Sequence, residues 1–301
     1  MPTPKVIKLV VKSGDKEELE RILLSNTSVF LEHSAFFEAI NVGQYEIFLM
    51  LFQKISKTVK FGLDILSHAI VGGNPEIFRC LLDKASTQSF DINMKNDHRS
   101  TLLMIAASAG NTAICSIILE KGAEINLVNR YDETALYNSI EKGHLETCKF
   151  LLRNNANFTP DLFERAIIKG HPKICSFLLD EGIAQISLSD YIRDTSLGLA
   201  IIYGHLEICE LLFAHGASLD YQDHMHETFM HLACREKKLE IAKFIFERMN
   251  TEIAISLNCY EHSAIQVWGA PFNSNQADQC LEDEDRNALC IHIGGLSSDI
   301  L

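Results

Sequence analysis

The amino-acid sequence predicts an all-α fold, built from about eight stacked helix-turn-helix units. One stretch recurs three times, as GHLETCKFLL at 143–152, GHPKICSFLL at 170–179 and GHLEICELLF at 204–213. Glycines in register with these stretches recur at intervals of 27 to 37 residues along the chain. Other residue types keep the same register, so the repeat does not depend on glycine alone. The register positions are Gly14, Gly43, Gly73, Gly110, Gly143, Gly170, Gly204 and then Lys237.

Each part of the unit has its own residue signal. Threonine recurs nine residues before the register position, and Asn or Asp five residues before each threonine. Threonine can cap a first helix, a small residue lets two helices approach, glycine forms a tight turn, and a Leu-rich second helix follows. One such unit cannot bury its own apolar face, so neighbouring units must stack. The recurring residues are Thr101, Thr134, Thr195 and Thr228; Asn96, Asn129, Asp190 and Asp223; and, four before the register position, Ala39, Ala69, Ala106, Ser139, Ala166, Ala200 and Ala233.

This register resembles the ankyrin repeat, whose pattern runs through T-P-L-H, a pair of small residues, G-H and a Leu-Leu-x-x-G-A close. The resemblance covers residues from about 5 to 265, is strongest from 96 to 245, and implies an ankyrin-repeat solenoid with short β-hairpin fingers. The family's His survives only as His231, and the unit at 161–182 is shortened and is expected to lack a proper finger. Leu102, Ala135, Ser196 and Phe229 stand where the family has Pro.

Three domains are expected from this pattern. Residues 1–95 are degenerate N-terminal repeats, 96–267 are better-matched repeats, and 268–301 form an acidic C-terminal cap or tail. The net charge is −13, and residues 251–301 hold eight acids against one base, Arg286. An acidic chain without a basic stripe is a poor ligand for nucleic acid. No stretch approaches the roughly 20 apolar residues of a membrane span, so we expect a cytoplasmic protein that is monomeric alone and does not insert into membranes.

Nine cysteines without a secretory signal favour reduced thiols over a disulfide framework. The recurring stretch places His144 four residues from Cys148, and the other two copies repeat that spacing. Imidazole and thiolate are zinc ligands, so the pattern raises the question of a metal site. In the register, however, Cys115, Cys148, Cys175 and Cys209 fall on the buried side of the second helix, about 10 Å apart from unit to unit. We therefore predict core packing and no metal, with weak adventitious binding left open.

No catalytic motif stands out in the sequence. Phosphate-binding glycine loops, H-E-x-x-H, G-x-S-x-G and C-x-x-C patterns are all missing from it. We predict a non-enzymatic protein without cofactors. The alternative is an enzyme whose Cys/His-based site lies in the tail, at Cys280, Cys290 and His292, and is supported by the repeats.

The resemblance also implies where a partner protein binds. Ankyrin arrays use their fingertips and the exposed positions seven and eight residues after each threonine. Tyr and Arg are frequent energetic anchors of interfaces, and both occur at these positions. Ile192 also falls at a fingertip position. The predicted partner-binding residues are Asp97, His98, Arg130, Tyr131, Lys142, Tyr191, Ile202, Tyr203, His224, Met225, Arg235 and Tyr260.

The C-terminal tail gives one further hint. Its acidic run 282–285, followed by apolar and small residues, looks like the export signal of type IV secreted effectors of Legionella-like intracellular bacteria. An ordinary solubilising cap and a terminal Asp-Ile-Leu peptide ligand for a PDZ-type groove are the alternatives. The sequence thus predicts an interaction module, either an adaptor or an effector working in a host cytosol on a partner that the sequence does not identify.

Overall fold

The computed structural model describes residues 4–25, 29–55, 61–187, 191–249, 253, 257–258 and 262–264. The chain divides into two compact units, 1–158 and 159–301. Sixteen α-helices lie within the described residues, in eight consecutive pairs, as the sequence predicts. None of these helices is long and apolar enough to cross a membrane.

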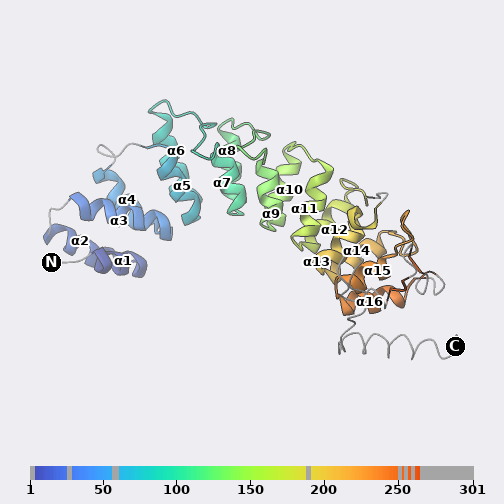
Figure 1. Ribbon diagram of the computed structural model, residues 1–301. Helices are drawn as coiled ribbons and strands as arrows, with labels where there is room; N and C mark the ends of the chain where they lie inside the picture. The colour runs from blue at the N-terminus through green and yellow to red at the C-terminus, as the bar shows by residue number, and fades with distance from the viewer. Residues whose placement is uncertain are drawn as a thin grey trace. The chain divides into compact units, whose positions relative to one another are not determined.

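The first unit holds five helix pairs in two layers (Figure 1). Each first helix packs against the first helix of the next pair, and α4, α6, α8 and α10 contact one another in the same order. The first helices are α1 (Pro4–Ser13), α3 (Val29–Val42), α5 (Leu63–Gly72), α7 (Leu102–Ser108) and α9 (Ala135–Glu141). The second helices are α2 (Lys16–Ser25), α4 (Tyr45–Ile55), α6 (Pro75–Ser86), α8 (Thr112–Glu120) and α10 (Leu145–Arg153).

The second unit holds three pairs and a short 3-10 helix. Helices α11, α13 and α15 contact in sequence, as do α12, α14 and α16. Its elements are α11 (Pro160–Ile168), α12 (Pro172–Asp180), η1 (Ile192–Asp194), α13 (Ser196–Tyr203), α14 (Leu206–Ala214), α15 (Phe229–Arg235) and α16 (Leu239–Phe246). Only residues 154–159 separate α10 from α11, so the predicted absence of a full finger before residue 161 is confirmed.

The predicted register is confirmed by backbone geometry and burial. All seven register glycines have positive φ, and Lys237 adopts the same left-handed conformation with φ 53°. Thr101, Thr134, Thr195 and Thr228 each accept a hydrogen bond from the backbone N–H three residues later, at the start of a first helix. The small residue four positions before the turn is fully or almost fully buried in every repeat from Ala39 to Ala233. The degenerate N-terminal repeats therefore share the architecture of the better-matched ones.

The histidine after the turn glycine connects neighbouring repeats. His144 Nε2 lies 3.0 Å from the carbonyl oxygen of Ser108 in the preceding repeat. A Cβ added to Gly110 would lie 2.6 Å from His144 Nδ1, so the glycine makes room for the ring. In the second unit His205 Nε2 lies 3.2 Å from the oxygen of Ile168 in the same way. These histidines are therefore structural links between repeats.

The four recurring thiols are fully buried, which confirms their predicted place in the core. Burial raises the pKa of Cys115, Cys148, Cys175 and Cys209 to about 12. A thiol with such a pKa stays protonated at neutral pH and is a poor nucleophile and metal ligand. Within the part of the chain that the structure describes, no three His, Cys, Asp or Glu side chains come together as a metal site would require.

Candidate partner-binding surface

The fingers are closed by a side chain rather than by long strands. Asn129 Oδ1 accepts hydrogen bonds from the backbone N–H groups of Tyr131, at 2.8 Å, and Glu133, at 3.1 Å. Asn96 and Asp223 make the same pair of contacts in their own fingers. This explains why Asn or Asp recurs five residues before threonine, since both accept such bonds in turns. The predicted hairpin is reduced to one antiparallel bridge in the finger before α15, between Gln222 and Thr228. In the finger before α9 the backbone hydrogen bond between the two sides runs from the N–H of Asn129 to the carbonyl oxygen of Glu133, at 3.1 Å.

Each of these turns needs one residue with positive φ. Arg99, Asp132 and His226 occupy that position, with φ of 59°, 59° and 55°. The two residues between the Asn or Asp and this position form the tip of the finger. The structure thus places Asp97, His98, Arg130, Tyr131 and His224 at the tips with exposed side chains, and Met225 at a tip half-buried.

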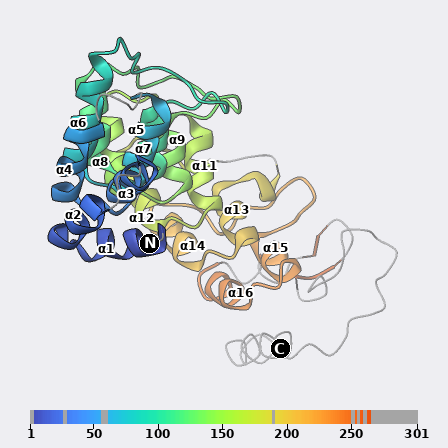
Figure 2. The same cartoon turned by 90° about the vertical axis from the view of Figure 1, so that its left-hand side faces the viewer.

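Neighbouring fingers of the first unit are tied together. The N–H of Arg130 donates to the carbonyl oxygen of His98 at 3.3 Å. Lys95 Nζ donates to the oxygen of Val128 at 2.9 Å, and the N–H of Glu124 to Asn93 Oδ1 at 2.9 Å. Figure 2 shows the two loops, teal and green, extending side by side from the helices. The tips of the first unit therefore form one continuous surface with mixed charges.

The finger before α13 differs from this pattern and corrects one expectation. Ile192, which the register assigns to a fingertip, is buried in the 3-10 helix η1. A Cβ on Gly198 would lie 1.9 Å from the carbonyl oxygen of Ile192, so η1 packs directly onto α13. The hydroxyl of Thr195 also donates to that oxygen, at 2.9 Å. Because glycine replaces the side chain present at this position in other repeats, the finger collapses inward.

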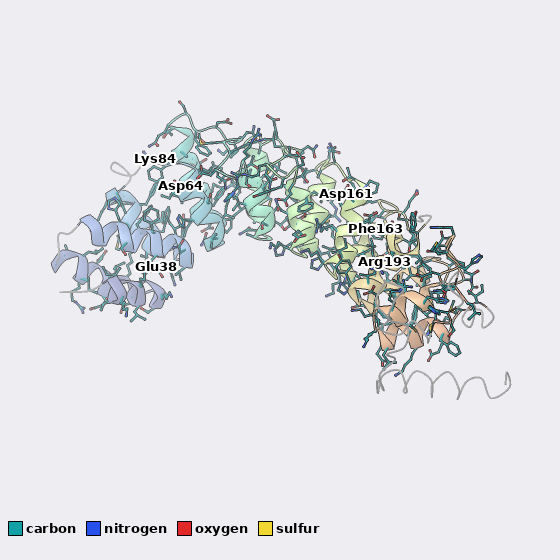
Figure 3. All side chains as sticks on the ribbon, viewed as in Figure 1. Glu38, Asp64, Lys84, Asp161, Phe163 and Arg193 are labelled. Carbon is teal, nitrogen blue, oxygen red and sulfur yellow. The ribbon has the colours of Figure 1, made fainter. Side chains whose placement is uncertain are left out.

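The collapsed finger makes two contacts across the face of the second unit. The ring of Tyr191 meets the ring of His224 in the next finger edge-on, with centroids 4.7 Å apart. Arg193 of η1, labelled in Figure 3, forms an ion pair with Glu236 at the end of α15, with Nη1 3.0 Å from Oε1. Two side chains of one repeat thus reach the following repeat.

Arg235 is bound within the protein itself. Its guanidinium pairs with both oxygens of Glu227, one of them 2.7 Å from Nη1, and the two side chains are 12% and 9% exposed. Burial pushes the pKa of Glu227 up, but the hydrogen bonds and charge of Arg235 outweigh it and hold that pKa below its usual value. Arg235 therefore joins the end of α15 to its finger.

The remaining predicted residues are at the ends of the first helices. Lys142 and Tyr203 are exposed, and Ile202 is half-buried. Tyr131, Tyr191 and Tyr203 keep 63%, 55% and 49% of their surface exposed. Tyr260 lies outside the described residues, as do Cys280, Cys290 and His292.

Two further residues at the ends of first helices are exposed, and the sequence-based prediction did not include them. Val42 and Val71 stand one and two residues before their turn glycines, in the register of Lys142 and Ile202, and are 38% and 73% exposed. The signal that could have found them is the spacing to Gly43 and Gly73, which holds even where the other repeat residues are absent.

Comparison with known proteins follows the same register. A family model described as ankyrin repeats, in three copies, matches residues 36–129, 66–162 and 163–259. The chain is 26% identical over 178 residues to the Ankyrin repeat and KH domain-containing protein mask-1 of Caenorhabditis elegans, covering 58% of this chain and 6% of that protein. It is 27% identical over 185 residues to the Transient receptor potential cation channel subfamily A member 1 homolog of the same organism, covering 60% of this chain and 12% of that one.

A solved structure shows the same fold. The ankyrin repeat domain of human ASB11 superposes with a TM-score of 0.56 at 22% identity, covering 75% of this chain and 96% of the other. Since this chain spans about an eighth or less of the two curated relatives, their likeness concerns the repeats alone.

Proposed function

Because this chain belongs to the ankyrin-repeat family, whose repeats are protein-protein interaction modules, we propose that it binds a partner protein through its fingertips and the exposed ends of its first helices. The supporting observation is the exposure of Tyr131, Tyr191 and Tyr203. Large aromatic side chains that folding leaves in water are frequent anchors of interfaces.

The residues proposed to contact the partner are the predicted ones that lie at the surface, together with Val42 and Val71. Arg235 is proposed to hold this surface in place and not to contact the partner through its charge, because its guanidinium is bound by Glu227. The boundaries proposed for the three domains, at residues 95 and 267, remain predictions from the sequence. More specifically, we propose that the protein acts as an adaptor in a cytoplasm or as a secreted effector in a host cytosol. The effector role is supported by the acidic run 282–285, which lies outside the described residues.

The proposal is tested by partner capture from a cell lysate with the wild-type chain and with the variant Tyr131→Ala/Tyr191→Ala/Tyr203→Ala. Capture should be lost in the variant, since each hot-spot truncation costs about 2 kcal/mol. The matched control is Leu24→Ala on the second helix α2, where Leu24 is 78% exposed. Capture by the triple variant at wild-type level would reject the face.

Hydrogen exchange of the captured complex gives an independent answer. The fingers at 96–101 and 129–134 and the end of α13 should gain protection, and the second helices should not. Protection confined to the second helices would place the interface on the opposite layer.

The alternative, an enzyme with a Cys/His site in the tail, is distinguished by a thiol-reactive probe at neutral pH. Fast and selective labelling of Cys280 or Cys290 would favour it over a binding module.

A further inference from the structure

We propose that the ends of α3, α5 and α7 in the first unit bind an amphipathic α-helix of the partner protein, laid across these three helices. This inference rests on the proposed function and adds the secondary structure and the chemistry of the segment that is bound. The residues involved, called the valine strip, are Val42, Val71, Gly72, Ile105, Ser108 and Ala109.

The valine strip lies on one face because its members hold equivalent places in stacked helices. Each stands one, two or five residues before the glycine of its turn, and positions three and four apart share one side of a helix. Helix α3 contacts α5, and α5 contacts α7 (Figure 1). A Cβ on Gly72 of α5 would lie 1.9 Å from the carbonyl oxygen of Ile40 in α3, so these two helix ends approach closely. The strip is therefore continuous over three repeats.

The valine strip is apolar and uncharged, in contrast to the same places in the repeats on either side. Val71 is 73% exposed and Val42 is 38% exposed, while Ala109 is exposed and Ile105 half-buried. The equivalent places hold Lys12 in the first repeat and Glu141 and Lys142 in the repeat of α9. A ligand that fits the strip therefore presents apolar side chains over three repeats.

Two titratable side chains lie one helical turn before the exposed valines. Glu38 is 8% exposed and pairs with Lys8 at 3.4 Å and with Lys12 at 3.9 Å. The ring of His68 meets the ring of Phe37 edge-on, with centroids 5.9 Å apart. The carboxylate of Glu38 is thus bound within the protein, and it does not select a charged ligand.

The backbone carbonyl groups beside the strip are already bonded between repeats. In each case a side chain of the next repeat reaches an oxygen at or near the turn: Asn74 to Gly43 at 3.0 Å, Asn111 to Gly73 at 3.0 Å and His144 to Ser108 at 3.0 Å. An extended peptide gains affinity from main-chain hydrogen bonds, and here it would find these acceptors in use. A helix satisfies its own backbone groups and needs only side-chain contacts.

The spacing of the repeats also fits a helix. Packed helices lie about 8 to 10 Å apart, and a helix returns a side chain to the same face after seven residues, about 10.5 Å further on. In a strand the residue at about 10 Å points to the opposite face. A polyproline segment repeats every 9.3 Å or so but prefers grooves lined by aromatic residues, which the strip does not contain. Apolar residues at i, i+7 and i+14 of a helix can therefore meet α3, α5 and α7 in turn.

The test selects peptides of about 17 residues from a displayed library against the full chain. The helical library has Leu, Ile or Val at three positions seven residues apart and Ala, Glu, Lys or Gln elsewhere. The matched library is identical except for central prolines, which break a helix. Binders should come from the helical library alone.

Variants of the strip then locate the bound peptides by fluorescence anisotropy. Val71→Lys and Ala109→Lys should each weaken binding at least about tenfold, because the bound helix would bury an unpaired charge. Both side chains are exposed, so the fold should be retained. Leu24→Lys on α2, where Leu24 is 78% exposed, is the control and should leave binding unchanged.

Three results would overturn the inference. Equal enrichment of both libraries excludes a helical ligand, and peptide binding that ignores both strip variants excludes the strip. A wild-type dimer that Val71→Lys turns into a monomer, measured by light scattering, assigns the strip to a second copy of the chain. If peptide binding ignores the strip variants while the triple tyrosine variant loses its captured partner, the inference fails and the proposed function stands. If helical peptides bind the strip although capture ignores the tyrosines, the inference stands and the tyrosines leave the proposed surface.

Discussion

The finger before α9 and the finger before α13 occupy the same place in their repeats but fold differently. In the first, Asn129 closes a turn through Asp132, and Arg130 and Tyr131 point outward. In the second, η1 replaces the turn and Ile192 is buried. The difference lies three residues after the capping threonine, where Tyr137 stands in one repeat and Gly198 in the other.

Other repeats show what a side chain at that position does. The N–H of Thr101 donates to Met104 Sδ, and the N–H of Thr228 donates to His231 Nδ1. In the repeat with Gly198, the N–H of Thr195 donates to the carbonyl oxygen of Ile192 instead. A backbone carbonyl has taken the place of the missing side-chain acceptor, so the residue at this helix position accompanies a different conformation of the finger.

The largest effect is expected from Gly198→Ala. The new Cβ would lie 1.9 Å from the oxygen of Ile192, and the free energy of unfolding should fall by about 3 kcal/mol. Urea denaturation followed by circular dichroism measures the change. Gly62→Ala is the control, because no atom lies within 4 Å of its added Cβ, and it should cost less than about 1 kcal/mol. Similar costs for both variants would contradict the close packing of η1 on α13.

The capping threonines that follow these two fingers, Thr134 and Thr195, give the next comparison. Thr134 accepts one hydrogen bond, from the N–H of Tyr137, so Thr134→Ala should cost about 1 kcal/mol. Thr195 accepts from Gly198 and also donates to Ile192, and Thr195→Ala should cost about 2 kcal/mol. Equal costs in the same denaturation experiment would mean that the second bond of Thr195 adds nothing.

The free energy of unfolding should depend on pH through His231, which stands three residues after the capping threonine Thr228. Burial lowers the pKa of His231, which is fully enclosed and bonded at both ring nitrogens. Below the pKa of about 6.5 that histidine has in the unfolded chain, the unfolded chain binds a proton that the folded chain does not bind. The free energy of unfolding therefore falls as the pH falls. This fall is expected between pH 7 and 5.5 and is measured by urea denaturation at each pH. His231→Gln should remove this part of the pH dependence, and an unchanged slope would assign it to other groups.

The smallest effect compares the turn residues. Asp132 has φ 59°, so Asp132→Gly should raise the free energy of unfolding by about 0.5 kcal/mol. Arg193 sits in η1 and pairs with Glu236, so Arg193→Gly at the corresponding position should lower it. Shifts of the same sign in thermal denaturation would remove the distinction between the two fingers.

The helix pairs could be predicted because each depends on short-range residue patterns that recur. Thr134 caps, Gly143 turns and Cys148 packs at the positions their register indicates. The surface was less accessible to sequence reasoning, because it depends on contacts between elements. Arg235 pairs with Glu227, eight residues before it, and no repeated pattern indicates that ion pair. The burial of Ile192 depends on the absence of a side chain at Gly198, which also shows no pattern along the chain.

The four recurring buried thiols have a practical consequence. Cys115, Cys148, Cys175 and Cys209 each mark one repeat, and each is hidden from solvent. A thiol reagent can reach them only when their own repeat opens, so the rate of modification at each site measures the free energy of that opening. A linear array can open either from its ends or as one block. Labelling followed by mass spectrometry would distinguish these two modes without any mutation, because four consecutive repeats each carry such a recurring thiol as an internal reporter.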